Sequence, residues 1–138
     1  MKVKQAMRRH VNWQPPGASL SDIAKIMKKE DIGAIPIGEN DRLVGMVTDR
    51  DIVIRGLSNG DNLSTLCARD VMTKHVLYCR EDDDIADAVS LMKKKQVRRL
   101  PVLNGAKRMT GMLSLGDVSH AADYSVTGDL VRAVSAHH

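Results

Sequence analysis

The sequence predicts an α/β (α+β) fold in which two β-α-β-β-α repeats pack with pseudo-two-fold symmetry. Three observations support this prediction. The chain of 138 residues repeats itself, so that Met7 matches Met72. Each copy alternates short apolar strands with amphipathic helical segments. Apolar residues make up 43% of the chain and charged residues 28%, which is typical of a globular protein.

The internal repeat is defined by segments that match after a constant shift. The shift is 65 residues at first, and one inserted residue then makes it 66. The matched segments are His10–Val11 with His75–Val76, Ile35–Ile37 with Leu100–Val102, Gly45–Thr48 with Gly111–Ser114, and Asp51 with Asp117. Such self-similarity indicates one supersecondary unit present twice.

Each element of the first copy follows from a local pattern. A short strand at 11–13 precedes a helix whose apolar residues recur every three to four positions. These residues are Leu20, Ile23, Ala24, Ile26 and Met27. Two apolar strands follow at 34–37 and 43–47, joined by a polar turn, and a second helix starts at about Asp49. Gly56 is expected to cap the end of that helix.

The second copy has the same order of elements. Strands are expected at 76–78, 100–103 and 109–113, and a second helix from about Leu115. Its first helix presents Ile85, Ala88, Val89, Leu91 and Met92. Residues 61–66 predict a short linking helix, and residues 126–136 predict a last helix with Leu130, Val131 and Val134 on one side.

The two copies are expected to form one module. A repeat of about 60 residues buries too little apolar surface to be stable alone. We therefore expect a single module over 1–138. It consists of a first repeat (1–57), a linker (58–67), a second repeat (68–124) and a C-terminal segment (125–138).

Composition excludes several classes of protein. No apolar run reaches the roughly 18–20 residues of a membrane span, and the N-terminus carries no apolar signal segment. Cys67 and Cys79 match no metal or redox spacing, so we expect a cytoplasmic protein with reduced thiols and no membrane partner. The net charge of +4 and the 2% of aromatic residues disfavour nucleic acid as a partner. The final pair His137–His138 is compatible with a native end or a tag remnant.

Sequence patterns for catalysis are absent. The chain has no glycine-rich phosphate loop, His-Glu-x-x-His sequence or nucleophile elbow. We therefore expect no catalytic residues, no enzymatic activity and no cofactor. His10 and His75 occupy matched positions, which would allow a metal site with Cys79. Two surface histidines are the simpler interpretation, and we expect no metal.

The tandem order of elements, with Gly-h-h-[Ser/Thr]-x-x-Asp at each last strand-to-helix junction, resembles the CBS-domain pair, or Bateman module. Arg69–Thr73 resembles the opening of a CBS repeat, and Val97–Val102 resembles its middle strand. Asp31–Ile37 and Val47–Arg55 are similar to stand-alone bacterial CBS pairs of the hypoxic-response type. The resemblance implies two clefts between the repeats that bind AMP, ADP, ATP or S-adenosylmethionine. It also implies a homodimer and a separate effector protein.

The resemblance places two sets of ligand-binding residues on this sequence. The first cleft would use Val11, Trp13, Ala34, Ile35, Pro36, Thr48 and Asp51. The second cleft would use Val76, Tyr78, Arg98, Arg99, Leu100, Pro101, Ser114 and Asp117. Trp13 and Tyr78 occupy matched positions, which would allow stacking on a purine. The glycine before each hydroxyl residue, Gly45 or Gly111, would let a ligand approach the backbone.

The hydroxyl and carboxylate residues have two interpretations. Ser or Thr followed three residues later by an acid is also the pattern of a helix capping box. The same pattern at Ser19–Asp22 starts a helix where the family binds nothing. The residues alone therefore leave capping and ligand binding open.

Charge distinguishes the two clefts. Arg98 and Arg99 are matched by Gly33 and Ala34, and a guanidinium binds phosphate through a bidentate fork. We therefore expect the second cleft to bind an adenine nucleotide more tightly than the first. The predicted function is a non-enzymatic regulatory sensor for an adenine nucleotide or a related adenosyl ligand. The alternative is a ligand-free protein–protein adaptor that uses the dimer surface.

Overall fold

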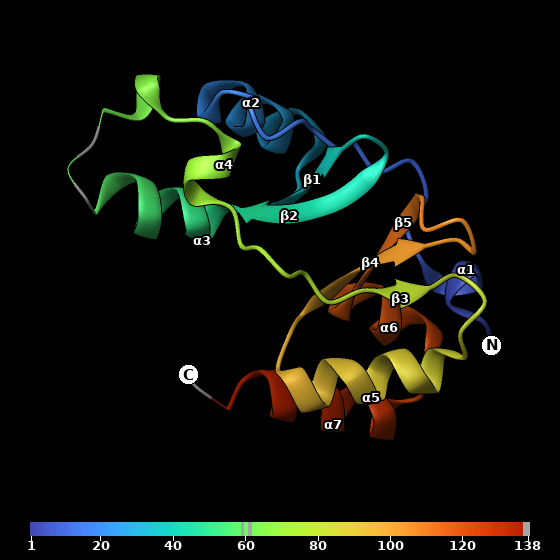
Figure 1. The fold of residues 1–138 in the computed structure, drawn as a ribbon. Coiled ribbons are helices and arrows are strands. Elements are labelled where there is room, and N and C mark those ends of the chain that lie inside the picture. The colour runs from blue at the N-terminus through green and yellow to red at the C-terminus, as the bar shows by residue number, and fades with distance from the viewer. Residues whose placement is uncertain (59, 61, 137–138) are drawn as a thin grey trace. The chain divides into compact units, whose positions relative to one another are not determined.

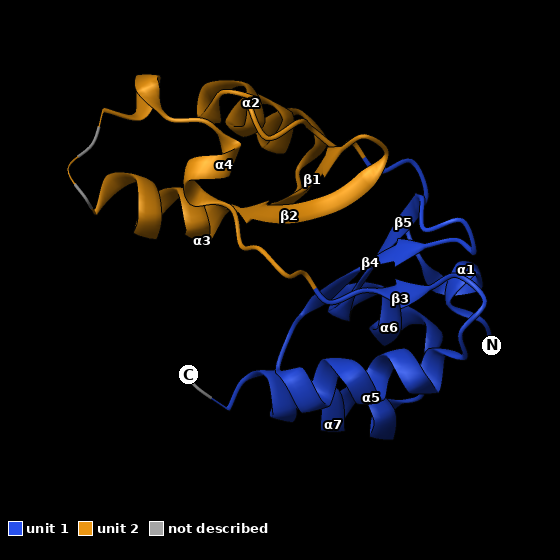
Figure 2. Ribbon diagram, in the orientation of Figure 1, with its two compact units in different colours: residues 1–11, 77–138 blue, residues 12–76 orange. Residues whose placement is uncertain are grey.

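The computed structural model describes residues 1–58, 60 and 62–136. The chain forms two compact units (Figure 2). Unit 2 is residues 12–76, and unit 1 combines residues 1–11 with residues 77–138. The units therefore do not coincide with the sequence repeats at their ends. Residues 1–11 pack with the second repeat, and residues 68–76 pack with the first.

Unit 2 is a two-stranded antiparallel sheet with helices (Figure 1). Its elements are α2 (Leu20–Glu30), β1 (Ala34–Glu39), β2 (Arg42–Thr48), α3 (Asp49–Asp51), η1 (Ile52–Leu57), η2 (Leu63–Thr65) and α4 (Ala68–Val71). Gln14 forms a parallel bridge with Ile37, so the segment before α2 lies along β1. Apolar side chains from α2, β1, β2 and α4 form the core. These are Leu20, Ile23, Met27, Ile35, Ile37, Val47, Ala68 and Val71.

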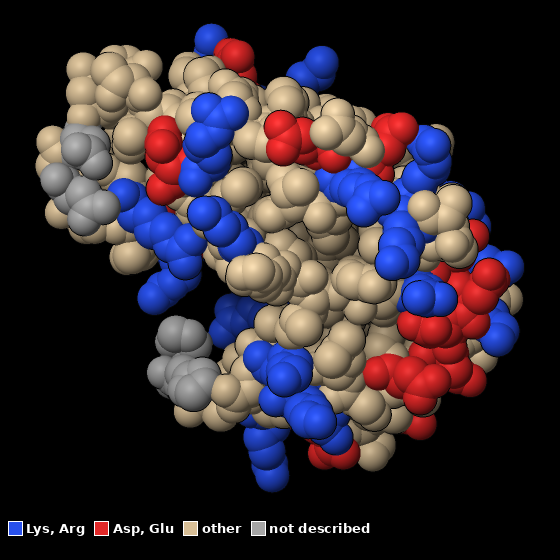
Figure 3. Space-filling view, viewed as in Figure 1, with Lys and Arg blue, Asp and Glu red and all other residues tan. Residues whose placement is uncertain are grey.

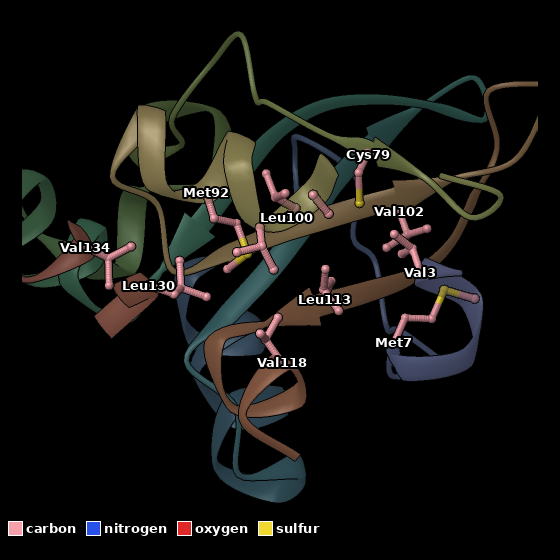
Figure 4. Packing of buried hydrophobic residues seen from close by; sticks show 12 residues of the cluster. Val3, Met7, Cys79, Met92, Leu100, Val102, Leu113, Val118, Leu130 and Val134 are labelled. Carbon is pink, nitrogen blue, oxygen red and sulfur yellow. The ribbon is translucent and has the colours of Figure 1, made fainter. Parts of the chain in front are cut away.

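Unit 1 is a three-stranded sheet in the order β3-β4-β5 with helices. Its elements are α1 (Val3–Ala6), β3 (Cys79–Arg80), α5 (Ile85–Lys95), β4 (Arg99–Leu103), β5 (Met109–Ser114), α6 (Leu115–Ala121) and α7 (Tyr124–Val134). The side chains of Leu100, Val102 and Leu113 extend from the sheet into the core (Figure 4). Met92 of α5 and Leu130 of α7 complete it on the helical side.

The first helix of each repeat, α2 or α5, ends at matched positions. The hydroxyl oxygen of Ser19 accepts from the backbone N–H of Asp22 and starts α2, as predicted. Both long helices end at a residue in the left-handed region, Asp31 with φ 53° and Gln96 with φ 55°. The two repeats thus share even the unusual backbone conformation that stops the first helix.

A short helix is packed onto each sheet, and it comes from the opposite repeat. In unit 1, Arg8 exchanges two backbone hydrogen bonds of 2.9 Å with Met112. In unit 2, Thr73 exchanges bonds of 2.8 and 3.0 Å with Met46. These ladders fix α1 and α4 beside the strands β5 and β2.

Gly45 and Gly111 are explained by this packing and not by a ligand. A Cβ on Gly111 would lie 2.6 Å from the carbonyl oxygen of Arg8. A Cβ on Gly45 would lie 2.5 Å from the sulfur of Met72. The interpretation that these glycines open the backbone to a ligand is therefore replaced by close approach of another chain segment.

The acidic run after β3 also holds the N-terminal segment. Acidic side chains gather over the β3–α5 loop of unit 1 (Figure 3). Lys4 forms a salt bridge of 2.8 Å with Asp82, and the backbone N–H of Val3 donates to the carbonyl of Asp83 at 2.9 Å. The hydrogen bond between the two side chains raises the pKa of Lys4 and lowers that of Asp82. This loop leads into α5, whose N-cap is Asp84, and it is also a contact surface for α1.

The fold class and most elements agree with the prediction, and some details differ. The first strand of each repeat was expected at 11–13 and 76–78, but the strand pairing lies further along the chain, at Gln14 and at Cys79–Arg80. Gly56 lies inside η1, where its missing Cβ makes room for Leu63, and it is not the cap. Leu130 and Val134 of α7 are buried, but Val131 is exposed. The expected linking helix is η2, although residues 59 and 61 of the linker lie outside the described residues.

Candidate functional site

Four of the predicted residues meet at one end of the β4–β5 hairpin in unit 1. Arg99 lies directly opposite Ser114 in the antiparallel pairing. The backbone N–H of Leu115 donates to the carbonyl of Arg98 at 2.8 Å, which ties the start of α6 to the start of β4. Asp117 lies in the first turn of α6. The fold thus places the backbones of Arg98 and Arg99 next to the hydroxyl and the carboxylate of the strand-to-helix junction.

The capping interpretation is confirmed at both junctions. The hydroxyl oxygen of Ser114 accepts from Asp117 N–H at 3.0 Å, and the Asp117 carboxylate accepts from Ser114 N–H at 2.9 Å. Thr48 and Asp51 form the same reciprocal pair at 3.0 and 2.9 Å. Capping fixes these side chains in place.

Capping does not use all the hydrogen-bonding groups of these residues. The second carboxylate oxygen of Asp117 and the hydroxyl hydrogen of Ser114 have no hydrogen-bond partner within the part of the chain that the structure describes. Both residues are partly exposed. A carboxylate oxygen that can accept and a hydroxyl that can donate are the groups that a ribose and a phosphate require.

Strand alternation divides the predicted lining residues between two faces. Arg99 and Pro101 lie on the face of Ser114, because residues two apart in a strand share a face. Leu100 lies on the other face, fully buried in the core of unit 1. Ile35 is likewise buried in the core of unit 2. The side chains of Leu100 and Ile35 therefore contribute to packing and do not line the site face.

The junction in unit 2 has the same scaffold with a different charge. Ala34 lies opposite Thr48, and Asp49 N–H donates to the carbonyl of Gly33 at 3.0 Å. The Asp49 carboxylate accepts from the backbone N–H of Arg50 at 2.9 Å. A Cβ on Gly33 would lie 3.0 Å from the other Asp49 oxygen, so the carboxylate stands directly over this glycine. Asp49 was not among the predicted residues. The signal that could have found it is that its match in the second repeat, Leu115, is apolar.

Three predicted residues belong elsewhere. The indole of Trp13 packs on Gly38, where a Cβ would lie 2.8 Å from the ring. Gly38 is four residues along β1 from Ala34, or about 13 Å in an extended strand. The structure therefore does not bring Trp13 to Thr48. Val11 lies in unit 1 with the second-repeat junction, and Val76 lies in unit 2 with the first-repeat junction.

The remaining predicted residues are Pro36 and Tyr78. Pro36 is buried on the Thr48 face of β1, since it lies two residues from Ala34. Tyr78 is exposed directly before β3. Neither has a recorded contact that assigns it a role.

The two thiols have different environments. Cys79 is buried, and burial raises the pKa of its thiol to about 12. Its sulfur lies 3.9 Å from the carbonyl oxygen of Pro101, behind the site face. Cys67 is half-buried at the start of α4, where hydrogen bonds from its backbone N–H and its thiol lower the pKa of Asp70. A protonated thiol is a poor nucleophile and a poor metal ligand.

Two features are absent from the described residues. No group of three His, Cys, Asp or Glu residues among them is arranged to hold a metal ion. None of the helices in residues 1–58, 60 and 62–136 is both long enough and apolar enough to cross a membrane.

Comparison with known proteins gives three informative relatives. A Methanopyrus kandleri protein, MK0525, is 33% identical over 91% of this chain, and the chain spans 65% of its length. Hypoxic response protein 1 of Mycobacterium tuberculosis is 36% identical over 84% of this chain and 81% of its own. A crystal structure of Hypoxic Response Protein I with two coordinated zinc ions has a TM-score of 0.80 at 33% identity. It covers 89% of this chain and 100% of that one.

A further structure and a family model complete the comparison. The crystal structure of CBSX2 in complex with AMP has a TM-score of 0.75 at 25% identity. It covers 87% of this chain and 94% of that one. The family model for the CBS domain matches residues 3–57 and again residues 68–124. These two matches, with the duplicated strand-to-helix junctions, show that the chain belongs to the CBS-domain family as a tandem pair.

Proposed function

We propose that this protein is a non-enzymatic regulatory sensor that binds an adenine nucleotide or a related adenosyl ligand. The observation that carries the proposal is the meeting of Arg98, Arg99, Ser114 and Asp117 at one junction of unit 1. The AMP complex of CBSX2, a protein of the same fold, supports the choice of ligand class. AMP, ADP, ATP and S-adenosylmethionine are the candidate ligands.

Each residue of the junction has a role in this proposal. The free carboxylate oxygen of Asp117 accepts hydrogen bonds from the ribose hydroxyls. The Ser114 hydroxyl donates to the phosphate, and the guanidinium groups of Arg98 and Arg99 compensate its charge. Because the capping bonds already fix Ser114 and Asp117, binding orders few additional side chains.

In this proposal the protein passes a signal to another protein and catalyses no reaction. No nucleophile and base are hydrogen-bonded to each other at either described junction, where the hydroxyl and carboxylate serve as caps. We propose a homodimer, since η1 exposes Val53, Ile54 and Leu57 as an apolar surface. An effector protein would then respond to the liganded state of the dimer.

Calorimetric titration tests the proposed site. AMP and adenosine are titrated into the wild type and into the Arg98→Ala/Arg99→Ala double variant. Loss of charge-assisted contacts should weaken AMP by roughly ten- to hundredfold and adenosine far less. The loss for AMP should shrink as salt rises, because partly exposed charges are screened.

Two controls show which junction binds the ligand and whether the arginines contact its phosphate. Asp51→Ala alters the other junction, and a larger loss of AMP from this variant would move the main site to unit 2. Equal losses for AMP and adenosine in the double variant would remove the phosphate role of the arginines. A thermal-shift series with AMP, ADP, ATP and S-adenosylmethionine adds an independent readout, because a ligand of the folded state must raise Tm. No binding and no shift in the wild type would favour the ligand-free adaptor.

A further inference from the structure

The two junctions differ most at one pair of positions. In unit 1 the pair is Arg98 and Leu115, and in unit 2 it is Gly33 and Asp49. The backbone is the same in both, since the residue after the hydroxyl donates to the carbonyl of its partner at 2.8 Å in unit 1 and 3.0 Å in unit 2. The exchange of side chains therefore takes place on one scaffold. Unit 1 has a cation beside an apolar residue at these two positions. Unit 2 has a glycine with a carboxylate over it.

The carboxylate of Asp49 is held over Gly33 by two features. One of its oxygens accepts the backbone N–H of Arg50 at 2.9 Å, which orients the group. Its other oxygen occupies the space that a side chain at position 33 would fill, 3.0 Å from the ideal Cβ position. Gly33 thus provides the room, and Asp49 fills it with negative charge. An arginine at position 33, matching Arg98, would collide with this carboxylate.

No cation neutralises Asp49 in the described structure. No ion pair of Asp49 is found among the described residues, so the exposed side chain of Arg50 forms none with it. Asp51, two residues further along, adds a second carboxylate, as Asp117 does in unit 1. A phosphate placed beside Thr48, as the proposed function places it beside Ser114, would meet a fixed like charge.

We infer that the unit 2 junction selects an adenosyl ligand whose 5′ substituent is neutral or cationic, and that Asp49 is the residue that rejects nucleoside phosphates. This inference rests on the proposed function, because it assumes that both junctions hold the ribose through their capping aspartates. The two units then respond to different members of the adenosyl pool. Unit 1 binds anionic nucleotides, and unit 2 binds a nucleoside or a sulfonium compound such as S-adenosylmethionine.

The test separates the two junctions with conservative variants. Asp117→Asn, made throughout together with Arg98→Ala and Arg99→Ala, removes the ribose-accepting charge and both phosphate-binding cations of unit 1 but keeps an oxygen that can accept the capping N–H, so unit 2 is measured. Asp51→Asn is the matched variant for measuring unit 1. Adenosine, AMP and S-adenosylmethionine are titrated calorimetrically into each. With Asp117→Asn, AMP should bind roughly tenfold or more weakly than adenosine, and S-adenosylmethionine should bind at least as tightly as adenosine. With Asp51→Asn, AMP should bind more tightly than adenosine.

Changes at Asp49 then test the selecting residue itself. In the Asp117→Asn background, Asp49→Asn removes the charge with little change of shape, and Asp49→Leu introduces the residue found in unit 1. Both should raise the ratio of AMP affinity to adenosine affinity roughly tenfold. An unchanged ratio, or a loss of AMP affinity on Arg50→Ala in this background, would overturn the inference and leave the proposed function standing. Failure of all three probes to bind the wild type would overturn the proposed function and this inference with it.

Discussion

Replacing Gly111 by alanine tests how the N-terminal segment is held on unit 1. A Cβ at this position would lie 2.6 Å from the carbonyl oxygen of Arg8 and 2.7 Å from the sulfur of Met7. The methionine side chain can rotate away, but the Arg8 carbonyl cannot move without breaking its bridge to Met112. The alanine methyl group must therefore displace backbone, and not only a side chain.

The size of the effect follows from the contacts that are lost. Two backbone hydrogen bonds join Arg8 to Met112, each worth about 0.5–1.5 kcal/mol, and overpacking costs about 1–3 kcal/mol. Alanine also restricts the unfolded chain, which recovers about 0.4–1 kcal/mol. With both hydrogen bonds lost, we expect a net loss of about 1–5.5 kcal/mol in the free energy of unfolding.

Urea unfolding of wild type and variant measures this loss, and amide hydrogen exchange at Arg8 should speed up in the variant. Gly105→Ala is the matched control, since a Cβ there meets nothing within 4 Å and its stability should be unchanged or slightly higher. Gly45→Ala should cost less than Gly111→Ala, because its closest contact is the movable sulfur of Met72 while the Thr73 carbonyl lies at 3.1 Å. A Gly111→Ala protein with wild-type stability and wild-type exchange at Arg8 would refute the packing argument.

Three further outcomes are expected. Gly128→Ala should stabilise the protein by about 0.8–1.0 kcal/mol, because this glycine lies inside α7 with open space around it. Thermal denaturation measures the change, and a Tm below that of the wild type would contradict the prediction. The folded-state pKa of Cys79, about 12, exceeds its usual 9.0, so the unfolded chain loses this proton first and stability should fall as pH rises from 9 to 12. Urea unfolding of wild type and Cys79→Ala from pH 9 to 12 measures this loss. An equal fall in the free energy of unfolding in both proteins would show that the Cys79 thiol is not its cause. Ile54→Asp should shift the proposed homodimer towards monomer in sedimentation equilibrium, because it charges the exposed apolar surface of η1, and an unchanged mass would place the contact elsewhere.

Sequence pattern predicted the sheets and long helices because apolar residues form continuous buried runs in β1 and β4 and recur every three to four positions in α2 and α5. Ile35 and Leu100 were correctly predicted as apolar strand residues, but a continuous apolar run does not show which side chains face the core, and both of these do. The capping boxes were visible as spacing, yet spacing cannot tell which oxygen stays free. The origin of α1 and α4 was not visible, because their contacts with the opposite repeat depend on tertiary approach at Gly45 and Gly111.

The origin of α1 has a consequence for how the chain folds during synthesis. Unit 2 is one continuous stretch, residues 12–76, and its parts are all available before the residues that follow Val76 emerge from the ribosome. Unit 1 needs residues 1–11, which are made before unit 2, to join residues that are made after it. Arg8 must wait for Met112 while the whole of unit 2 is synthesised between them. Residues 1–11 therefore reach their native partners only after unit 2 has been synthesised, and unit 1 can be completed only after β5 has been translated.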